Sequence, residues 1–304
     1  MPGKIFRPIV FILFTMCFTQ PGIAADRMPV FVSIAPQKYF VQEIGKDLVD
    51  VQVMVQAGAD PHTYEPRPRQ MVAISKAKLY FAIGVEFEVA YLDKIIATNP
   101  QIRLVRTDQG IEKIPMTAHH HGEEEHHDKE AGHHEEGEHE HEGRPDPHIW
   151  LSPPLVMTQA RTILNALQET DPSHAAAYEA NYNVFVSDLT KLDTDLKQIF
   201  SGKRGLRFMA FHPSWGYFAR AYGLKQVAIE TEGKAPKPAQ LKELIRHARE
   251  SDIRVVFAQP QFSSKSAKLL GNEIGGEVTF VDPLAENWSA NLREVASKFR
   301  AALK

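Results

Sequence analysis

Residues 173–200, with the sequence SHAAAYEANYNVFVSDLTKLDTDLKQIF, form a long stretch that contains neither glycine nor proline. Apolar side chains recur along it every three or four residues, the period of an amphipathic helix, at Tyr178, Tyr182, Phe185, Leu189, Leu192 and Leu196. At 1.5 Å per residue this helix would be roughly 40 Å long, which is longer than one small domain needs. We therefore predict a rigid connecting helix over residues 173–201 that joins two domains.

The sequence before this helix alternates between strand-like and helix-like patterns. Short runs rich in β-branched and aromatic residues predict strands at 30–34, 49–55, 79–83 and 102–105. Helical periods predict helices at 38–44, 68–77, 86–98 and 155–169. Strands that alternate with helices are typical of a parallel sheet, so we expect an N-terminal α/β lobe over residues 26–172.

The same alternation resumes after the helix. Strands are predicted at 207–211, 225–229, 253–258 and 277–281, and helices at 215–222, 238–250, 264–274 and 289–303. These elements predict a C-terminal α/β lobe over residues 202–304. A chain of 304 residues is also longer than a usual single domain. The predicted fold class is α/β: two lobes, each with a mainly parallel sheet flanked by helices, joined by one long rigid helix.

The N-terminus has the pattern of a secretory signal. Lys4 and Arg7 precede an apolar run over residues 9–18, and small residues follow at Ala24 and Ala25. This pattern predicts a signal peptide over residues 1–25, cleaved near Ala24 or Ala25. The run is too short for a stable transmembrane helix, and no other stretch approaches the roughly 20 apolar residues that a span needs. We expect an exported, soluble, periplasmic protein.

The only cysteine, Cys17, lies within this signal. A lipid-anchored protein is the alternative, but the preceding residues 14–16, Phe-Thr-Met, are not the small residues that a lipid-attachment signal usually has. A mature chain without cysteine forms no disulfide and offers no thiolate to a metal. Any transition-metal site must therefore use histidine with aspartate or glutamate.

Residues 117–144 form a tract of histidine and acidic residues with almost no apolar side chain. Nine histidines lie in it: His119, His120, His121, His126, His127, His133, His134, His139 and His141. Such a segment cannot bury enough apolar surface to offset its ordering entropy, so we predict a disordered loop. Imidazoles are common ligands of transition metals, which makes the loop a candidate for weak, accessory metal binding. The alternative is a low-complexity loop that only interacts with water.

The overall charge argues against nucleic acid as a partner. The formal net charge is −3, and the acidic tract supplies most of the negative charge. The remainder of the chain shows no basic cluster of the kind that binds phosphate backbones.

Three histidines outside the tract have a proline beside them: His62, His148 and His212. His62 and His148 each follow an Asp-Pro pair, the first of them after a predicted strand, and His212 lies at the end of a predicted strand. Proline restricts its neighbours, so each imidazole would lie on a stiff loop. Asp282 ends the strand at 277–281 and also precedes a proline. Two of these four residues come from each half of the chain, and ligands bind at the carboxyl ends of strands in α/β sheets. The four could converge on one ion.

A site of three neutral imidazoles and one carboxylate suits zinc and also permits manganese or ferrous iron. The alternative is that each histidine is a hydrogen-bonded structural residue. His174 and His247 lie within helical patterns and are expected on the surface.

Four segments carry a resemblance to a known family: DPHTYEP at 60–66, DPHIWLSP at 146–153, FHPSWGYF at 211–218 and VDPLAENW at 281–288. They resemble the metal-binding segments of the cluster A-I solute-binding proteins, the extracytoplasmic receptors of bacterial zinc and manganese ABC transporters. The histidine-rich insert resembles the zinc (ZnuA-like) branch, and the resemblance covers essentially the whole mature chain.

The resemblance implies two α/β lobes joined by one long helix, with the metal held between them by His62, His148, His212 and Asp282. It places the histidine-rich loop at the mouth of the cleft. It further implies a receptor without enzymatic activity that captures Zn²⁺ and delivers it to an inner-membrane ABC permease. A periplasmic metal chaperone is a further expected partner, and we expect a monomer.

Three alternatives differ from this interpretation. The first is a manganese or iron receptor of the same family, and the second is a periplasmic metal buffer or adhesin with no permease. The third is a secreted zinc hydrolase, for which Glu65 could serve as general base. A hydrolase needs an open metal position, whereas four protein ligands would close the site, and the sequence contains no His-Glu-x-x-His motif.

Overall fold

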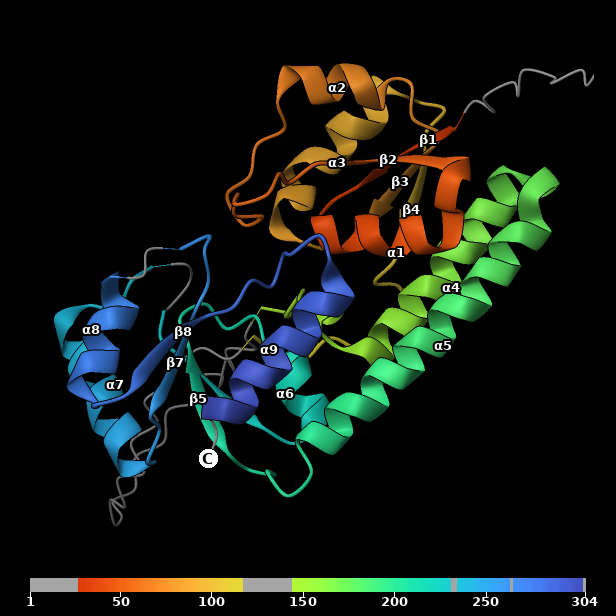
Figure 1. Ribbon diagram of the computed structural model, residues 1–304. Coiled ribbons are helices and arrows are strands. Elements are labelled where there is room, and N and C mark those ends of the chain that lie inside the picture. Colours follow the sequence, from red (N-terminus) through yellow and green to blue (C-terminus); the bar gives the residue numbers. More distant parts are fainter. Residues whose placement is uncertain (1–26, 117–143, 231–233, 263–264, 303–304) are drawn as a thin grey trace, which may run out of the picture.

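The structure is a computed structural model that describes residues 27–116, 144–230, 234–262 and 265–302 (Figure 1). The predicted signal peptide and the histidine-rich tract up to residue 143 lie outside these ranges, so both remain predictions.

The N-terminal lobe is built on a four-stranded parallel sheet. Its strands are β1 (Met28–Val32), β2 (Val49–Val53), β3 (Leu79–Ala82) and β4 (Arg103–Arg106), in the order β2-β1-β3-β4. The lobe's helices are α1 (Ala35–Gly45), the short η1 (Lys46–Leu48), α2 (Pro68–Ile74) and α3 (Glu86–Thr98). Every residue of β3 is buried, as expected for a central strand covered on both faces.

The C-terminal lobe repeats this topology. Its strands are β5 (Arg207–Ala210), β6 (Lys225–Ala228), β7 (Val255–Ala258) and β8 (Glu277–Phe280), in the order β6-β5-β7-β8, and all pairs are parallel. Its helices are α6 (Gly216–Tyr222), α7 (Pro238–Glu250), α8 (Lys265–Glu273) and α9 (Trp288–Ala302). In both sheets the strand order reverses beside the first strand, which is where α/β folds bind ligands.

A pair of helices joins the two lobes. The predicted connecting helix is α5 (Ala175–Ile199). The helix before it, α4 (Pro153–Thr170), leads into α5 through the short turn η3 (Pro172–His174) and packs along it (Figure 1). The α-helix begins at Ala175, two residues later than predicted, because residues 172–174 form a 3₁₀ turn. Helix α5 contacts α1 in the N-terminal lobe and α9 in the C-terminal lobe. The connection is therefore a two-helix hairpin that supports both lobes.

Two tryptophans fasten the lobes together near the site. The Trp288 indole N–H donates to the Trp150 carbonyl at 2.7 Å, and the Trp150 indole N–H donates to the Pro283 carbonyl at 2.7 Å. The Trp288 ring also packs edge-on against Phe40 of α1, with ring centroids 5.1 Å apart. One hydrophobic core consequently runs through both lobes and the helical hairpin. Within the part of the chain that the structure describes, no helix combines the length and apolarity needed to cross a bilayer.

Candidate metal centre

His62 lies in the loop after β2 and is oriented by two carboxylates. The Asp60 carboxylate accepts the backbone N–H of His62 at 2.9 Å, which closes a tight turn around Pro61. The ring Nδ1 lies 2.7 Å from a carboxylate oxygen of Glu86, the first residue of α3. The side chain of His62 remains 16% exposed, so it is the accessible member of the site.

Glu86 is positioned by the turn between β3 and α3. Gly84 has a φ of +89°, a conformation that L side chains rarely adopt. The buried Glu88 carboxylate accepts the backbone N–H groups of Ile83 at 2.9 Å and Gly84 at 2.8 Å, and the Ser33 hydroxyl from the end of β1 donates to it at 2.5 Å. This network fixes the start of α3 and therefore the carboxylate that supports His62.

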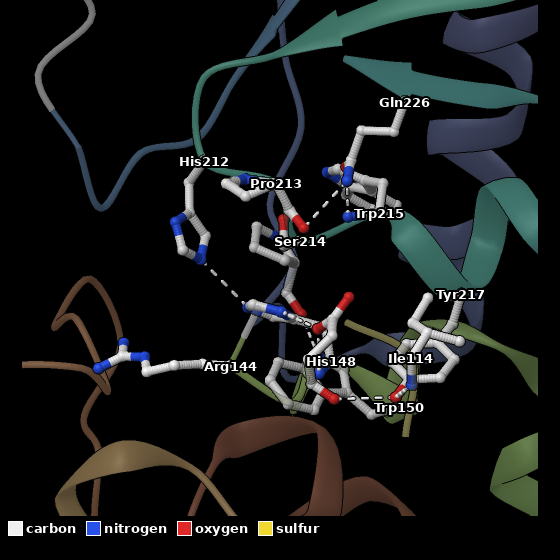
Figure 2. A network of polar contacts seen from close by, with 12 residues as sticks. Ile114, Arg144, His148, Trp150, His212, Pro213, Ser214, Trp215, Tyr217 and Gln226 are labelled. Atoms are coloured by element: carbon white, nitrogen blue, oxygen red, sulfur yellow. Dashed lines mark hydrogen bonds and ion pairs between the residues drawn. The ribbon is translucent and has the colours of Figure 1, made fainter. Parts of the chain in front are cut away.

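His148 is buried, with 2% of its surface exposed, and one carboxylate holds it. The same oxygen of Asp146 accepts the His148 backbone N–H at 2.9 Å and contacts ring Nδ1 at 2.6 Å. Tyr217 of α6 anchors this loop, because its hydroxyl donates to the Asp146 carbonyl at 2.9 Å and accepts the Ile114 N–H at 3.1 Å (Figure 2). Although His148 precedes the connecting helix in sequence, the C-terminal lobe positions it.

His212 follows β5 and is equally buried. Its Nδ1 lies 2.7 Å from the carboxylate of Glu230, which follows β6. Gln259 fixes its backbone, accepting the His212 N–H at 3.1 Å and donating to its carbonyl at 2.6 Å. The imidazole stacks on the Phe262 ring with centroids 4.8 Å apart.

The loop after His212 is secured from β6. The Gln226 side chain accepts the Trp215 N–H at 2.8 Å and donates to the Pro213 carbonyl at 3.1 Å (Figure 2). Both loops that carry buried histidines are thus fastened to the same lobe.

The three imidazoles converge through their Nε2 atoms. His212 Nε2 lies 2.9 Å from that of His62 and 3.2 Å from that of His148, and Figure 2 shows the His148 and His212 rings pointing toward one another. The ligand atoms of all three lie within 4.8 Å of one another. Nitrogens bound to one tetrahedral zinc at 2.0–2.1 Å would be about 3.3 Å apart, so the spacing is close to that of a zinc site.

The carboxylates determine what these nitrogens can bind. Each Nδ1 faces a carboxylate, which places the ring proton on Nδ1 and leaves an unshared pair on Nε2. Three unshared pairs this close repel one another unless a cation lies between them. The arrangement is therefore a candidate cation site, and its donor atoms are those preferred by zinc.

Charge and burial act differently on the histidines. Burial works against protonation of His62, but its hydrogen bond to Glu86 and that carboxylate's charge raise its pKa above the ordinary value. The same pairing lowers the pKa of Glu86 despite burial. Burial, together with the nearby His148 and His62, holds the pKa of His212 well below its ordinary value. His212 is thus neutral and available as a ligand near neutral pH.

The enclosed space at this centre is small. The cavity measures about 10 Å³, which is close to the room that one water molecule requires. Besides the three histidines, it is lined by Asp60, Pro61, Trp150, Gln261, Phe262, Pro283 and Leu284. The site can accept one ion with few additional ligands.

Asp282, the fourth residue predicted for the site, lies outside this group of three histidines. Its Oδ1 accepts the Leu284 N–H at 2.9 Å and the Gln261 side-chain N–H at 2.7 Å. The carboxylate thus closes a turn in the way that Asp60 and Asp146 do. Glu65, the conceivable base of a hydrolase, is exposed and does not line the cavity.

The sequence alone did not identify the carboxylates behind the imidazoles. The pattern Asp-x-His around His148 could have indicated Asp146, because an aspartate two residues earlier can reach both the backbone and the ring. Glu86 and Glu230 had no comparable local signal, since each is brought to its histidine only by the fold.

Comparison with known proteins shows which family the chain belongs to. The family model for ZnuA, the periplasmic zinc-uptake complex component A, matches residues 30–302. The chain is 31% identical over 263 residues to the high-affinity zinc uptake system protein ZnuA of Bacillus subtilis, covering 85% of this chain and 79% of that protein.

Solved structures show the same fold. A crystal structure of ZnuA has a TM-score of 0.80 and 42% identity, covering 92% of this chain and 100% of that one. A ZnuA deletion mutant with zinc bound has a TM-score of 0.81 and 42% identity, covering 92% of this chain and 99% of that one. On the family match over nearly its whole described length, the chain belongs to the ZnuA family of periplasmic zinc-uptake components.

Proposed function

We propose that this protein is an extracytoplasmic receptor that captures one Zn²⁺ between its lobes through His62, His148 and His212 and delivers it to an ABC permease. The observation that carries the proposal is the convergence of three Nε2 atoms, each opposite a carboxylate at Nδ1. A carboxylate behind a histidine fixes its tautomer and strengthens it as a ligand. Family membership supports the same function.

The donor set favours zinc over manganese and iron, which remain the second candidates. Manganese prefers oxygen ligands and a higher coordination number. This centre instead presents three nitrogens to a cavity of about 10 Å³. Zinc accepts three imidazoles and one further ligand in a tetrahedral arrangement.

A receptor of this family is a component of uptake and not an enzyme. The arrangement around the ion agrees with capture, because the carboxylates nearest the imidazoles all face Nδ1 atoms. Each of them orients a ligand, and none is left beside Nε2 to act as a general base.

The histidine-rich tract is proposed as an accessory collector. Many weak sites tethered near one tight site would raise the local zinc concentration. Arg144 is the last residue of the tract, and its guanidinium lies 3.4 Å from Glu86, the carboxylate that supports His62. The described end of the tract is therefore beside the accessible ligand, which supports a position at the mouth of the site.

The remaining parts of the proposal concern location and partners. The N-terminal pattern supports export with cleavage near Ala24 or Ala25 and a periplasmic, monomeric receptor. The proposed partners are an inner-membrane metal permease and a periplasmic metal chaperone.

Zinc titration against a competing chelator tests the proposal. The protein should bind one Zn²⁺ tightly. His212→Ala should lose this tight site, because only two of the three imidazole ligands remain. His174→Ala is the matched control, since His174 lies at the far end of the helical hairpin and contacts Asp171. Near-native affinity in His212→Ala would refute the assigned site.

A further inference from the structure

Three Asp-Pro turns surround the metal centre, and they have the same geometry. In each, the aspartate Oδ1 accepts the backbone N–H two residues later at 2.9 Å: Asp60 with His62, Asp146 with His148, and Asp282 with Leu284. The first two turns present an imidazole to the ion. The third presents Leu284 at the corresponding position.

Leu284 separates two different spaces. On one side it lines the small metal cavity together with Pro283 and Phe262. On the other side it lines a groove of about 540 Å³ between the lobes, whose wall includes the polar side chains of Lys38 and Gln52. Leu284 is 9% exposed, and among the described parts of the chain it is the one residue that lines both spaces.

We infer that Leu284 closes the fourth side of the three-imidazole centre against this groove, and that it thereby limits how fast the ion leaves and how many water ligands reach it. The inference rests on the proposed zinc function. A branched apolar side chain cannot coordinate a metal, and it excludes the water that would replace imidazole during release. Few water ligands favour zinc over manganese, which prefers more oxygen ligands.

Two substitutions should change zinc release in opposite directions. Leu284→Ala opens the cavity to the groove, so zinc should dissociate roughly tenfold faster and the preference for zinc over manganese should fall by a similar factor. Leu284→His reproduces the sequence of the other two turns and adds an imidazole, so zinc should dissociate at least roughly tenfold more slowly. Dissociation is followed by transfer to an excess of chelator, and preference by Zn²⁺–Mn²⁺ competition.

Cobalt gives an independent readout of coordination. Co²⁺ bound to the wild-type protein should show the intense visible absorption of a four-coordinate ion, and Leu284→Ala should show the weaker absorption of higher coordination. Leu269→Ala, at an exposed leucine of α8, is the control and should match the wild type in every measurement.

The outcomes separate the two proposals. If both Leu284 variants release zinc faster, Leu284 serves only to pack the fold and the inference is refuted. Unchanged release rates in both variants would refute it as well. If the wild-type protein does not bind zinc tightly, or if His212→Ala binds it normally, the proposed function itself fails. If His212→Ala loses zinc but the Leu284 variants behave like the wild type, the proposed function is supported and the inference about Leu284 is wrong.

Discussion

Each imidazole of the centre depends on an acidic partner, and these partners differ in exposure. Asp146 and Glu230 are nearly fully buried, whereas the side chain of Glu86 is 24% exposed and also faces Arg144. The pair of His62 and Glu86 is therefore the part of the site that solvent and ions reach most easily. Changes at Glu86 should alter zinc affinity without unfolding the protein.

We predict that Glu86→Gln weakens zinc binding and shifts its dependence on pH. The raised pKa of His62 means that protons compete with zinc as the pH falls through that value. An uncharged amide stabilises the imidazolium less, so the pKa of His62 should fall and the loss of zinc should begin at lower pH. At high pH, affinity should be about tenfold lower because a supporting carboxylate is missing.

The measurement is a chelator competition at several pH values. Glu65→Gln is the control, because Glu65 is exposed and does not line the metal cavity. An unchanged pH profile in Glu86→Gln would show that the carboxylate does not govern His62.

At the scale of elements, the site is asymmetric. The loop after β5 carries His212, and the loop before α4 carries His148. Hydrogen bonds from β6 and α6 of the C-terminal lobe hold these two loops. The loop after β2 brings His62 from the other lobe. Capture and release of zinc would therefore involve one ligand moving relative to two that are held together.

We predict that Tyr217→Phe loosens the His148 loop. The substitution removes a hydrogen bond to the Asp146 carbonyl and one from the Ile114 N–H, both involving buried or partly buried groups. The free energy of unfolding should fall by about 1–3 kcal/mol in chemical denaturation. Zinc affinity should fall several-fold, whereas Tyr91→Phe on α3 should leave both quantities unchanged. Full affinity in Tyr217→Phe would mean that His148 does not depend on this anchor.

The elements themselves were largely predictable, because periodicity and turn residues act locally. Helices α3 and α7 begin and end where the sequence predicts, and the three histidines selected for the prolines beside them lie together in the fold. Partners that meet only in the folded chain were not predictable. In the sequence, the turn closed by Asp282 resembles the two loops that carry histidines. In the structure, however, the Asp282 carboxylate accepts the Leu284 backbone N–H, and the turn places Leu284 at the site.

At the scale of the whole molecule, the lobes share one core and one helical hairpin. The Trp150 and Trp288 hydrogen bonds and the packing of α5 against both lobes favour small movements over wide opening of the cleft. The proposed tight site therefore depends on the folding of both lobes.

We predict that deletion of residues 118–142 leaves one tight zinc site. The three imidazoles and their carboxylates lie outside the deleted segment, so affinity at this site should remain within about threefold of wild type, a change of less than 1 kcal/mol. Total zinc bound at high concentration should decrease because the weak sites are lost. Equilibrium dialysis with direct zinc analysis gives both numbers, and loss of the tight site would show that the tract supplies a primary ligand.

The position of the first bound ion shows whether the three imidazoles form the tight zinc site. Crystals grown with one equivalent of Zn²⁺ and measured at the zinc absorption edge should show a single strong anomalous peak. We expect this peak about 2.0–2.1 Å from the Nε2 atoms of His62, His148 and His212. A strongest peak within the histidine-rich tract, or one in which Asp282 replaces an imidazole, would contradict it.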